Sequence, residues 1–267
     1  MGELRGLDYS QRHATFERWF DTPLGQALLK DQRHCADERV ARLKGARQLQ
    51  IGISHRLPLA TRGDFSQRIM TTASWSAGLP SGVVVCDSDE LPFPSDSMDL
   101  VILHHSADFT AYPHQVLRES SRVLRSGGHM LILGFNPASL WGLRKLVSRH
   151  QEGPWGGRFL MPSRVEDWLS LLDFETESMD SHFFCPPIQS PALIDKLSNK
   201  EIPGLRFLPL GAYYCIVAKK RVFAPIGKIP ARRRLNVVPL RTPGPVALGR
   251  DFAQVIKKAR SGNRYDQ

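Results

Sequence analysis

The chain has 267 residues, of which 42% are apolar and 23% are charged, a balance that suits a globular protein with a sizeable core. Lys and Arg outnumber Asp and Glu by 36 to 26, and nearly all of this excess lies from Lys219 onward. No run approaches the roughly 18 consecutive apolar residues of a membrane span. The N-terminus also lacks the apolar core of a signal peptide, so the cytoplasm is the expected compartment.

The cysteines lie far apart in the sequence, without a CxxC pair and without a nearby histidine at metal-ligand spacing. We therefore expect reduced, mostly buried thiols and no metal site. The cysteines are Cys35, Cys86, Cys185 and Cys215.

The N-terminal part predicts one long helix over about residues 22–45. Asp21 and Thr22 are possible N-caps, Pro23 suits the first helical position, and Gly45 can end the helix. The apolar runs that follow predict a strand at 47–54 and a weaker strand at 68–75.

The middle of the chain contains three near-continuous apolar runs, which are typical of strands covered on both faces. A helix over 112–128, ending at Gly127 and Gly128, separates the last two runs. Strand, helix and strand with short connections predict a parallel sheet with right-handed crossovers. The three runs are 82–87, 98–105 and 129–135.

The C-terminal part predicts an amphipathic helix at 162–175, capped by Ser163. Two later strands, at 175–184 and 212–221, flank a Pro-rich loop with a short helix at 191–198. We divide the chain into a domain at 1–222 and a basic, flexible Pro/Arg-rich tail at 223–267.

The tail can attract nucleic acid or an anionic membrane surface weakly through charge alone. No stacking aromatic residues interleave with the cluster from Arg232 to Arg234, so a specific RNA site is not indicated.

Two consecutive segments of the middle region carry a family resemblance. They read "VVVCDSDELPFPSDSMDLVILHH" and "VLRESSRVLRSGGHMLILGF", and they span about residues 83–135. This text resembles the class I S-adenosylmethionine-dependent methyltransferases, in the branch of the ubiquinone and menaquinone methylases (methyltransferase type 11 domain). "GFNPASLWGLR" is also similar to a small bacterial subgroup of that branch.

The resemblance implies a Rossmann-like α/β fold, with a mostly parallel seven-stranded sheet and helices on both faces, and S-adenosyl-L-methionine as cofactor. It implies that Asp87 accepts a hydrogen bond from the exocyclic amine of the adenine, while the backbone N–H of Ser88 serves a ring nitrogen. Leu91 and Phe93 would line the apolar adenine slot, and Leu103 would contact the cofactor at the end of its strand. The alternative for Asp87 is a turn residue that caps a strand end.

The text "LQIGIS" departs from the family pattern of an apolar, an acidic and an apolar residue followed by Gly, any residue and Gly. Gly52 is retained beside the expected methionine portion of the cofactor, but Gln50 replaces the acid and Ser54 replaces the second glycine. The second predicted strand also lacks the carboxylate that grips the ribose hydroxyls, and Thr72 or Ser74 can replace it only in part.

His104 and His105 end the strand beside which the resemblance places the reactive methyl group. A neutral histidine there can take a proton from an oxygen or nitrogen nucleophile, so both are candidate catalytic residues. The family often carries His-x-x-Glu-His in this area, and here His105, Asp108 and Phe109 take those places. The alternative is that one histidine is packed and the other solvated.

Asn136 is a candidate for orienting the substrate or, alternatively, for capping a helix. Trp141, with Trp155, is a candidate wall of an acceptor pocket, or a part of the core. We expect methyl transfer from the cofactor to a small or lipid-like acceptor. The alternative is a catalytically silent binding or regulatory module of the same fold, which has lost its affinity for the cofactor.

Overall fold

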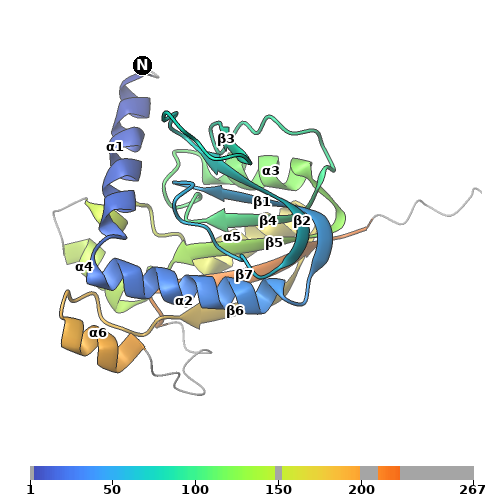
Figure 1. The fold of residues 1–267 in the computed structure, drawn as a ribbon. Coiled ribbons are helices and arrows are strands. Elements are labelled where there is room, and N and C mark those ends of the chain that lie inside the picture. The colour runs from blue at the N-terminus through green and yellow to red at the C-terminus, as the bar shows by residue number, and fades with distance from the viewer. Residues whose placement is uncertain (1–2, 148–151, 199–209, 223–267) are drawn as a thin grey trace, which may run out of the picture. The chain divides into compact units, whose positions relative to one another are not determined.

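A seven-stranded sheet with the order β3-β2-β1-β4-β5-β7-β6 organises the protein (Figure 1). The computed structural model describes residues 3–147, 152–198 and 210–222. Strands β1 to β5 are mutually parallel, and β7 lies antiparallel between β5 and β6. The predicted mostly parallel sheet is therefore confirmed. The strands are β1 (Lys44–Gly52), β2 (Asp64–Thr72), β3 (Val83–Val85), β4 (Met98–His104), β5 (Leu124–Phe135), β6 (Phe174–His182) and β7 (Tyr213–Lys220).

Helices cover both faces of the sheet, as the resemblance implied. Alternate side chains of β4 point to opposite faces, as the pleat of a strand requires. Leu100 and Ile102 join the cluster that contains α2, whereas Val101 and Leu103 join the cluster that contains α3 and α5. The helices are α1 (Glu3–Trp19), α2 (Pro23–Val40), α3 (Pro113–Val123), α4 (Leu140–Val147), α5 (Pro162–Leu171) and α6 (Pro191–Ser198), with a short 3₁₀ turn at Gly153–Gly156.

The start of α2 follows the sequence prediction, but its end does not. The Thr22 hydroxyl accepts a hydrogen bond from the Gly25 N–H at 3.2 Å, and Pro23 opens the helix. The helix ends at Val40, and Gly45 belongs to β1. A Cβ on Gly45 would lie 2.5 Å from the Cβ of Asp99, so this glycine permits close packing of β1 instead of ending a helix.

Two other helix boundaries also differ from the prediction. Helix α3 ends at Val123, because Leu124 is already extended and begins β5; Gly127 and Gly128 lie inside that strand. Helix α5 begins after Met161, which makes no side-chain capping bond, so Ser163 is not the cap. Helix α6 spans the predicted 191–198.

The connection between β1 and β2 is residues 53–63, and these contain no helix. Parallel neighbours usually need a helical crossover. Here α2, which precedes β1, takes the place of a crossover helix. It packs against the sheet and covers it with apolar residues such as Leu24 and Leu28.

The described residues contain no helix that is long and apolar enough to cross a membrane. Among the same residues, no group of three or more His, Cys, Asp or Glu side chains is arranged to hold a metal ion. Cys35, Cys185 and Cys215 are buried, Cys86 is partly buried, and all are free thiols. The predicted tail at 223–267 lies outside the described residues.

Candidate active site

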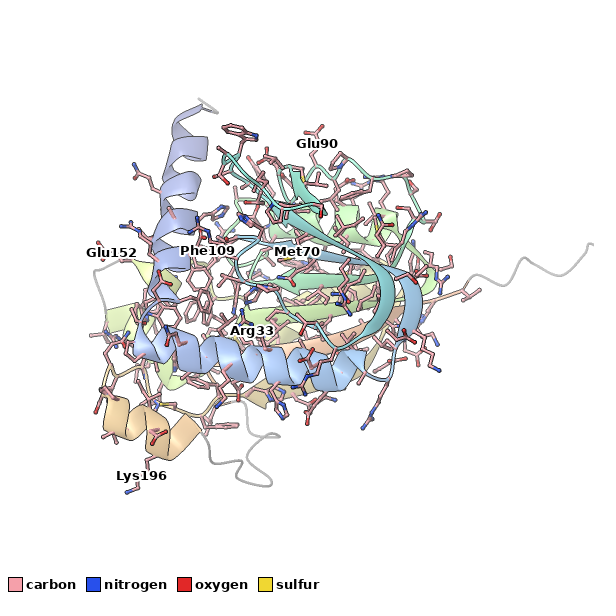
Figure 2. The ribbon with its side chains drawn as sticks, in the orientation of Figure 1. Arg33, Met70, Glu90, Phe109, Glu152 and Lys196 are labelled. Atoms are coloured by element: carbon pink, nitrogen blue, oxygen red, sulfur yellow. The ribbon has the colours of Figure 1, made fainter. Side chains whose placement is uncertain are left out.

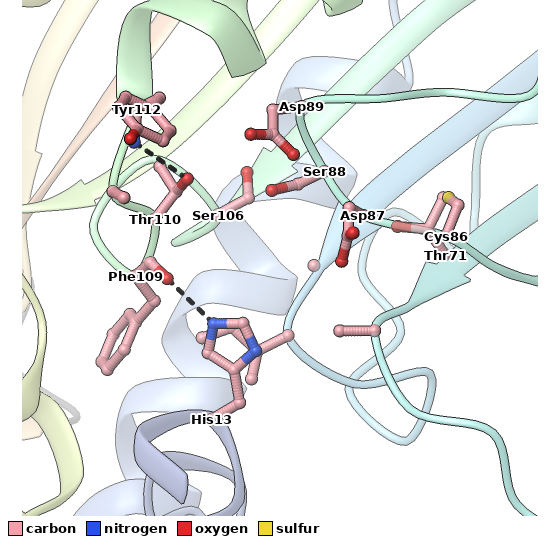
Figure 3. A pocket seen from close by; sticks show the side chains of 14 residues that line it. His13, Thr71, Cys86, Asp87, Ser88, Asp89, Ser106, Phe109, Thr110 and Tyr112 are labelled. Atoms are coloured by element: carbon pink, nitrogen blue, oxygen red, sulfur yellow. Dashed lines mark hydrogen bonds between the residues drawn. The ribbon is translucent and has the colours of Figure 1, made fainter. Parts of the chain in front are cut away.

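A cavity of about 290 Å³ opens at the carboxyl ends of β1 to β4, where parallel α/β sheets place their ligands (Figure 3). Its volume is near the lower bound of small-molecule pockets. Helix α1 and the loop after β4 complete its wall. The lining residues are His13, Gly52, Ile53, Thr71, Ala73, Cys86, Asp87, Ser88, Asp89, Ser106, Phe109, Thr110, Ala111 and Tyr112.

The segment after β3 brings Asp87 and Ser88 to the cavity, together with Asp89. Leu91 and Phe93 do not line it; Leu91 is buried and Phe93 packs against the core cluster that contains Leu91. Arg122 of α3 fixes this segment by donating to the carbonyl oxygens of Leu91 (2.9 Å) and Phe93 (2.8 Å). The two apolar residues thus anchor the chain that carries Asp87.

Glu119 completes this anchor. Its carboxylate accepts from Arg122 at 2.8 Å and from the Leu91 N–H at 3.3 Å. The Arg122 guanidinium lowers the pKa of Glu119, so the carboxylate stays ionised and the pair stays intact at neutral pH.

Gly52, at the end of β1, lines the cavity. A Cβ built there would make ordinary van der Waals contacts, 3.6 Å from the Cβ of His104 and 3.8 Å from Nε2 of Gln50. Packing of the protein itself therefore does not require glycine at this position. The atoms that such a side chain would meet belong to residues outside the cavity lining.

Gln50 and Ser54, which replace the acid and the second glycine of the motif, do not line the cavity. The buried Gln50 side chain holds the loop after β1, because it donates to the Leu57 carbonyl and accepts from the Leu59 N–H, both at 2.8 Å. The Ser54 hydroxyl donates to Glu17 of α1 at 2.8 Å.

His104 and His105 are buried below the cavity, and neither belongs to its lining. Gln32 of α2 lies between them: its carbonyl oxygen is 3.0 Å from His104 Nε2, and its amide nitrogen is 2.7 Å from His105 Nε2. His105 Nδ1 lies 2.8 Å from Asp108 Oδ2, which also accepts from the Phe135 N–H at 2.9 Å. These contacts pair both histidines with side chains of the core.

Burial determines the protonation states of His104, His105 and Asp108. It lowers the pKa of His105 to about 3, and it lowers the pKa of His104 well below its ordinary value. Both imidazoles are therefore neutral at pH 7. Burial also raises the pKa of Asp108 well above the ordinary carboxyl value, an effect that the Phe135 N–H partly offsets.

Helix α1 supplies a cavity residue that the sequence analysis missed. His13 Nε2 is 2.9 Å from the Phe109 carbonyl oxygen, which can only accept, so Nε2 carries the proton and Nδ1 keeps a lone pair. Burial lowers the pKa of His13, although the Phe109 carbonyl and the charge of Asp87 partly offset this effect. Figure 3 shows this imidazole between the Phe109 loop and Asp87.

Two polar atoms at the cavity residues have no hydrogen-bond partner in the described part of the chain. They are Nδ1 of His13 and the hydroxyl of Ser106, and both are buried. Seven further buried polar atoms of the described residues, such as Trp19 Nε1, are unpaired as well, so the lining as a whole, and not these two atoms alone, indicates a ligand site.

Aromatic packing holds α1 over the cavity. The rings of Phe16 and Phe109 stack with centroids 4.3 Å apart, and Phe109 lies beside α1 in Figure 2. The sequence carries one signal of this helix, since Phe16, Trp19 and Phe20 follow the i, i+3, i+4 spacing of a buried helix face.

The other predicted site residues lie in the core. Asn136 donates to the Gly211 carbonyl at 3.1 Å and accepts from the Ala138 N–H at 3.0 Å, so it orders the turn before α4. Trp141 is buried and donates to the Cys185 carbonyl at 2.9 Å. Leu103 is a core residue of β4, and Trp155 stacks on Trp141 with centroids 6.2 Å apart.

Comparison with known proteins agrees with this geometry. A family model described as a methyltransferase domain matches residues 52–132. An uncharacterized protein of Escherichia coli K12, YafS, is 33% identical over 219 residues, which cover 82% of this chain and 86% of YafS. A ubiquinone/menaquinone biosynthesis C-methyltransferase of Laribacter hongkongensis, UbiE, is 36% identical over 59 residues, 22% of this chain and 24% of that enzyme.

The chain belongs to the class I S-adenosylmethionine-dependent methyltransferases. The fold of this methyltransferase is that of solved members. An S-adenosylmethionine-dependent methyltransferase of Thermotoga maritima, described as a possible histamine N-methyltransferase, superposes with a TM-score of 0.58 at 19% identity, over 80% of this chain and 98% of that one. A methyltransferase of Archaeoglobus fulgidus gives a TM-score of 0.51 at 19% identity, over 70% and 94%.

The residues of the methyltransferase cavity fit the family cofactor, S-adenosylmethionine, at two of three positions. The carboxylate of Asp87 and the backbone of Ser88 are present for an adenine, and Gly52 lines the side where the methionine portion is expected. At the end of β2 the lining residues are Thr71 and Ala73, neither of which is a carboxylate. The carboxylate that the family pattern places there is therefore absent from the lining.

Proposed function

We propose that this methyltransferase transfers a methyl group from S-adenosylmethionine to a small or lipid-like acceptor through an oxygen or nitrogen atom that loses a proton. The observation that carries the proposal is the cavity between Gly52 and Asp87, with unpaired polar atoms of His13 and Ser106 on its α1 and β4 sides. Asp87 and Ser88 hold the adenine, and Gly52 lines the side that takes the methionine portion. The bound cofactor supplies an activated methyl group on a sulfonium.

His13 replaces His104 and His105 as the candidate base in this proposal. It lines the cavity, and its Nδ1 lone pair can accept the proton that an O–H or N–H acceptor loses. The lowered pKa keeps the imidazole unprotonated at neutral pH, which is the form that a base needs. The Ser106 hydroxyl can form a hydrogen bond with the oxygen or nitrogen atom that receives the methyl group, and so orient it.

Isothermal titration with S-adenosylmethionine and with its demethylated product tests cofactor binding. We expect saturable binding to the wild type, weakened about tenfold to a hundredfold in Asp87→Ala, because a charge-assisted hydrogen bond is lost. Asp167→Ala removes an exposed carboxylate of α5 as a matched control and should bind like the wild type. If neither compound binds to folded wild-type protein, the proposal fails.

The second candidate function is a catalytically silent binding or regulatory module. The observation that favours it is the end of β2, where Thr71 and Ala73 line the cavity in place of a ribose-binding carboxylate. This candidate predicts no binding of either compound in the titration above. Turnover of any acceptor by the intact protein would exclude it.

A further inference from the structure

Helix α4 exposes an apolar face formed by Leu140, Leu143, Leu146 and Val147. The exposed fractions of these side chains range from 56% for Leu140 to 83% for Leu146. An amphipathic helix of a globular protein normally turns such residues inward. An exposed apolar patch of contiguous residues indicates an interaction surface.

The exposure does not come from a loose helix. Trp141, on the opposite side of α4, is buried and donates its indole N–H to the Cys185 carbonyl at 2.9 Å. Arg144 donates to the Pro187 carbonyl and lies 4.2 Å from the centre of the Trp155 ring. These contacts fix α4 on the body of the protein with its leucines facing outward.

The segment that Arg144 contacts extends the apolar face. Ile188 follows Pro187 directly, and 49% of its side chain is exposed. We refer to the exposed side chains of α4 together with Ile188 as the α4 face. Leu193 of α6, in the same part of the chain as Ile188, is 39% exposed.

One cation lies exposed at the α4 face. Arg144 is exposed, whereas Lys145 turns inward and donates to the carbonyl oxygens of Trp155 and Gly157. The nearest carboxylates in sequence are Glu152, after α4, and Asp195, in α6. Exposed leucines beside an exposed arginine match an anionic bilayer, which offers an apolar interior below negatively charged headgroups.

We propose that the α4 face docks on an anionic lipid bilayer, with its leucine side chains inserted among the acyl chains and Arg144 at the headgroups. A protein partner would need a complementary groove, whereas a bilayer adapts to a convex helix. The excess of Lys and Arg beyond Lys219 adds attraction of the same sign, without specifying which face meets the lipid. This proposal does not depend on cofactor binding or catalysis.

Co-sedimentation of the full chain with vesicles tests the proposal. One set of vesicles is pure phosphatidylcholine, and the other contains about one third phosphatidylglycerol. We expect the wild type to sediment with the anionic vesicles, and less so as salt is raised. The double variant L143S/L146S should lose about tenfold or more in partition coefficient, because two inserted apolar side chains are removed.

Matched variants separate docking from folding. Leu171→Ser changes an 80% exposed leucine at the end of α5 and should sediment like the wild type. L143M/L146M keeps apolar side chains and should retain binding. Leu146→Ser alone, at the most exposed position, should weaken binding without changing the thermal unfolding midpoint.

Three results would overturn the proposal. One is a wild type that does not bind anionic vesicles. The second is L143S/L146S binding as tightly as the wild type, which would assign the binding to the basic tail. The third is a wild type that self-associates in sedimentation velocity, with L143S/L146S monomeric and neither binding vesicles, because a second copy would then cover the face.

Discussion

The two ends of the cavity differ in whether their polar side chains are available to a ligand or already bonded to the protein. At the β3 end, Asp87 and Ser88 project from a segment that Arg122 anchors from behind, so their polar groups are available to a ligand. At the β1 end, Ser54 is already engaged with Glu17 of α1. A residue that departs from a binding motif has thus become a contact between a loop and a helix. Loss of a motif residue does not by itself indicate a loss of function.

The largest effect should come from Gln50, which holds the loop at the β1 end. Gln50→Ala leaves the Leu57 carbonyl and the Leu59 N–H unpaired in a buried place, at about 1–3 kcal/mol each. We expect a loss of about 3 kcal/mol in the free energy of unfolding, measured by urea denaturation. Gln67→Ala, at an exposed position of β2, should change it by no more than about 0.5 kcal/mol.

Gly52→Ala tests whether the β1 end still serves a ligand. The new methyl group meets no protein atom within 3.6 Å, so the thermal unfolding midpoint should stay unchanged. Gly52 itself lines the cavity, so if the ligand packs on its backbone the added methyl group should lower S-adenosylmethionine affinity about tenfold, as isothermal titration would measure. Unchanged affinity would mean that the ligand does not reach this end.

The buried histidines below the β1 end should make stability depend on pH. Because their pKa values are lowered in the folded state, His104 and His105 take up protons only in the unfolded chain as the pH falls below about 6.5. Each of the two histidines then lowers the free energy of unfolding by up to about 1.4 kcal/mol for every unit by which the pH falls. Asp108, whose pKa is raised, acts in the opposite direction and reduces the net slope.

Urea unfolding at pH 7.5 and at pH 5.5 measures this slope. His104→Gln removes one titrating group while keeping a donor for Gln32, so its stability should fall less between the two pH values. An identical slope in wild type and His104→Gln would show that His104 is not kept neutral by burial.

Ser54→Gly should have the smallest effect, and it restores the glycine of the family pattern. It removes the hydrogen bond to Glu17, which is worth about 1 kcal/mol of unfolding free energy. Amide exchange in residues 11–19 of α1 should speed up, whereas cofactor affinity should not fall. A double-mutant cycle of Ser54→Gly with Glu17→Gln measures the coupling energy between the two side chains. A coupling energy near zero would contradict a stabilising hydrogen bond between them.

At each end the sequence placed some residues that line the cavity, namely Asp87, Ser88 and Gly52, and some that do not, namely Leu91, Phe93, Gln50 and Ser54. The order of residues around Asp87 is a local pattern, and the segment lies where that pattern implies. The position of His104 and His105 at a strand end did not reveal that Gln32 of α2 covers them, because this contact joins residues more than 70 positions apart. Helix α1 and His13 were missed because the polar residues before Phe16 gave no apolar period.

The sheet could be predicted because its central strands are near-continuous apolar runs. Helix boundaries were less predictable where a glycine could either end a helix or permit close packing. Gly45 was read as a helix end, yet it admits the close approach of Asp99 in the sheet. A sequence pattern does not distinguish a glycine chosen for backbone conformation from one chosen for close packing.

The order of the last strands has a consequence for how the site forms. Strand β7 is the last strand among the described residues, yet it lies between β5 and β6, and its Tyr213 donates to Asp31 of α2 at 2.7 Å across 182 residues of sequence. Gln32, which contacts both buried histidines, is the next residue of α2. Contacts of such long sequence separation form slowly and late. During synthesis, the packing of α2 against the buried histidines therefore stays incomplete until β7 has left the ribosome.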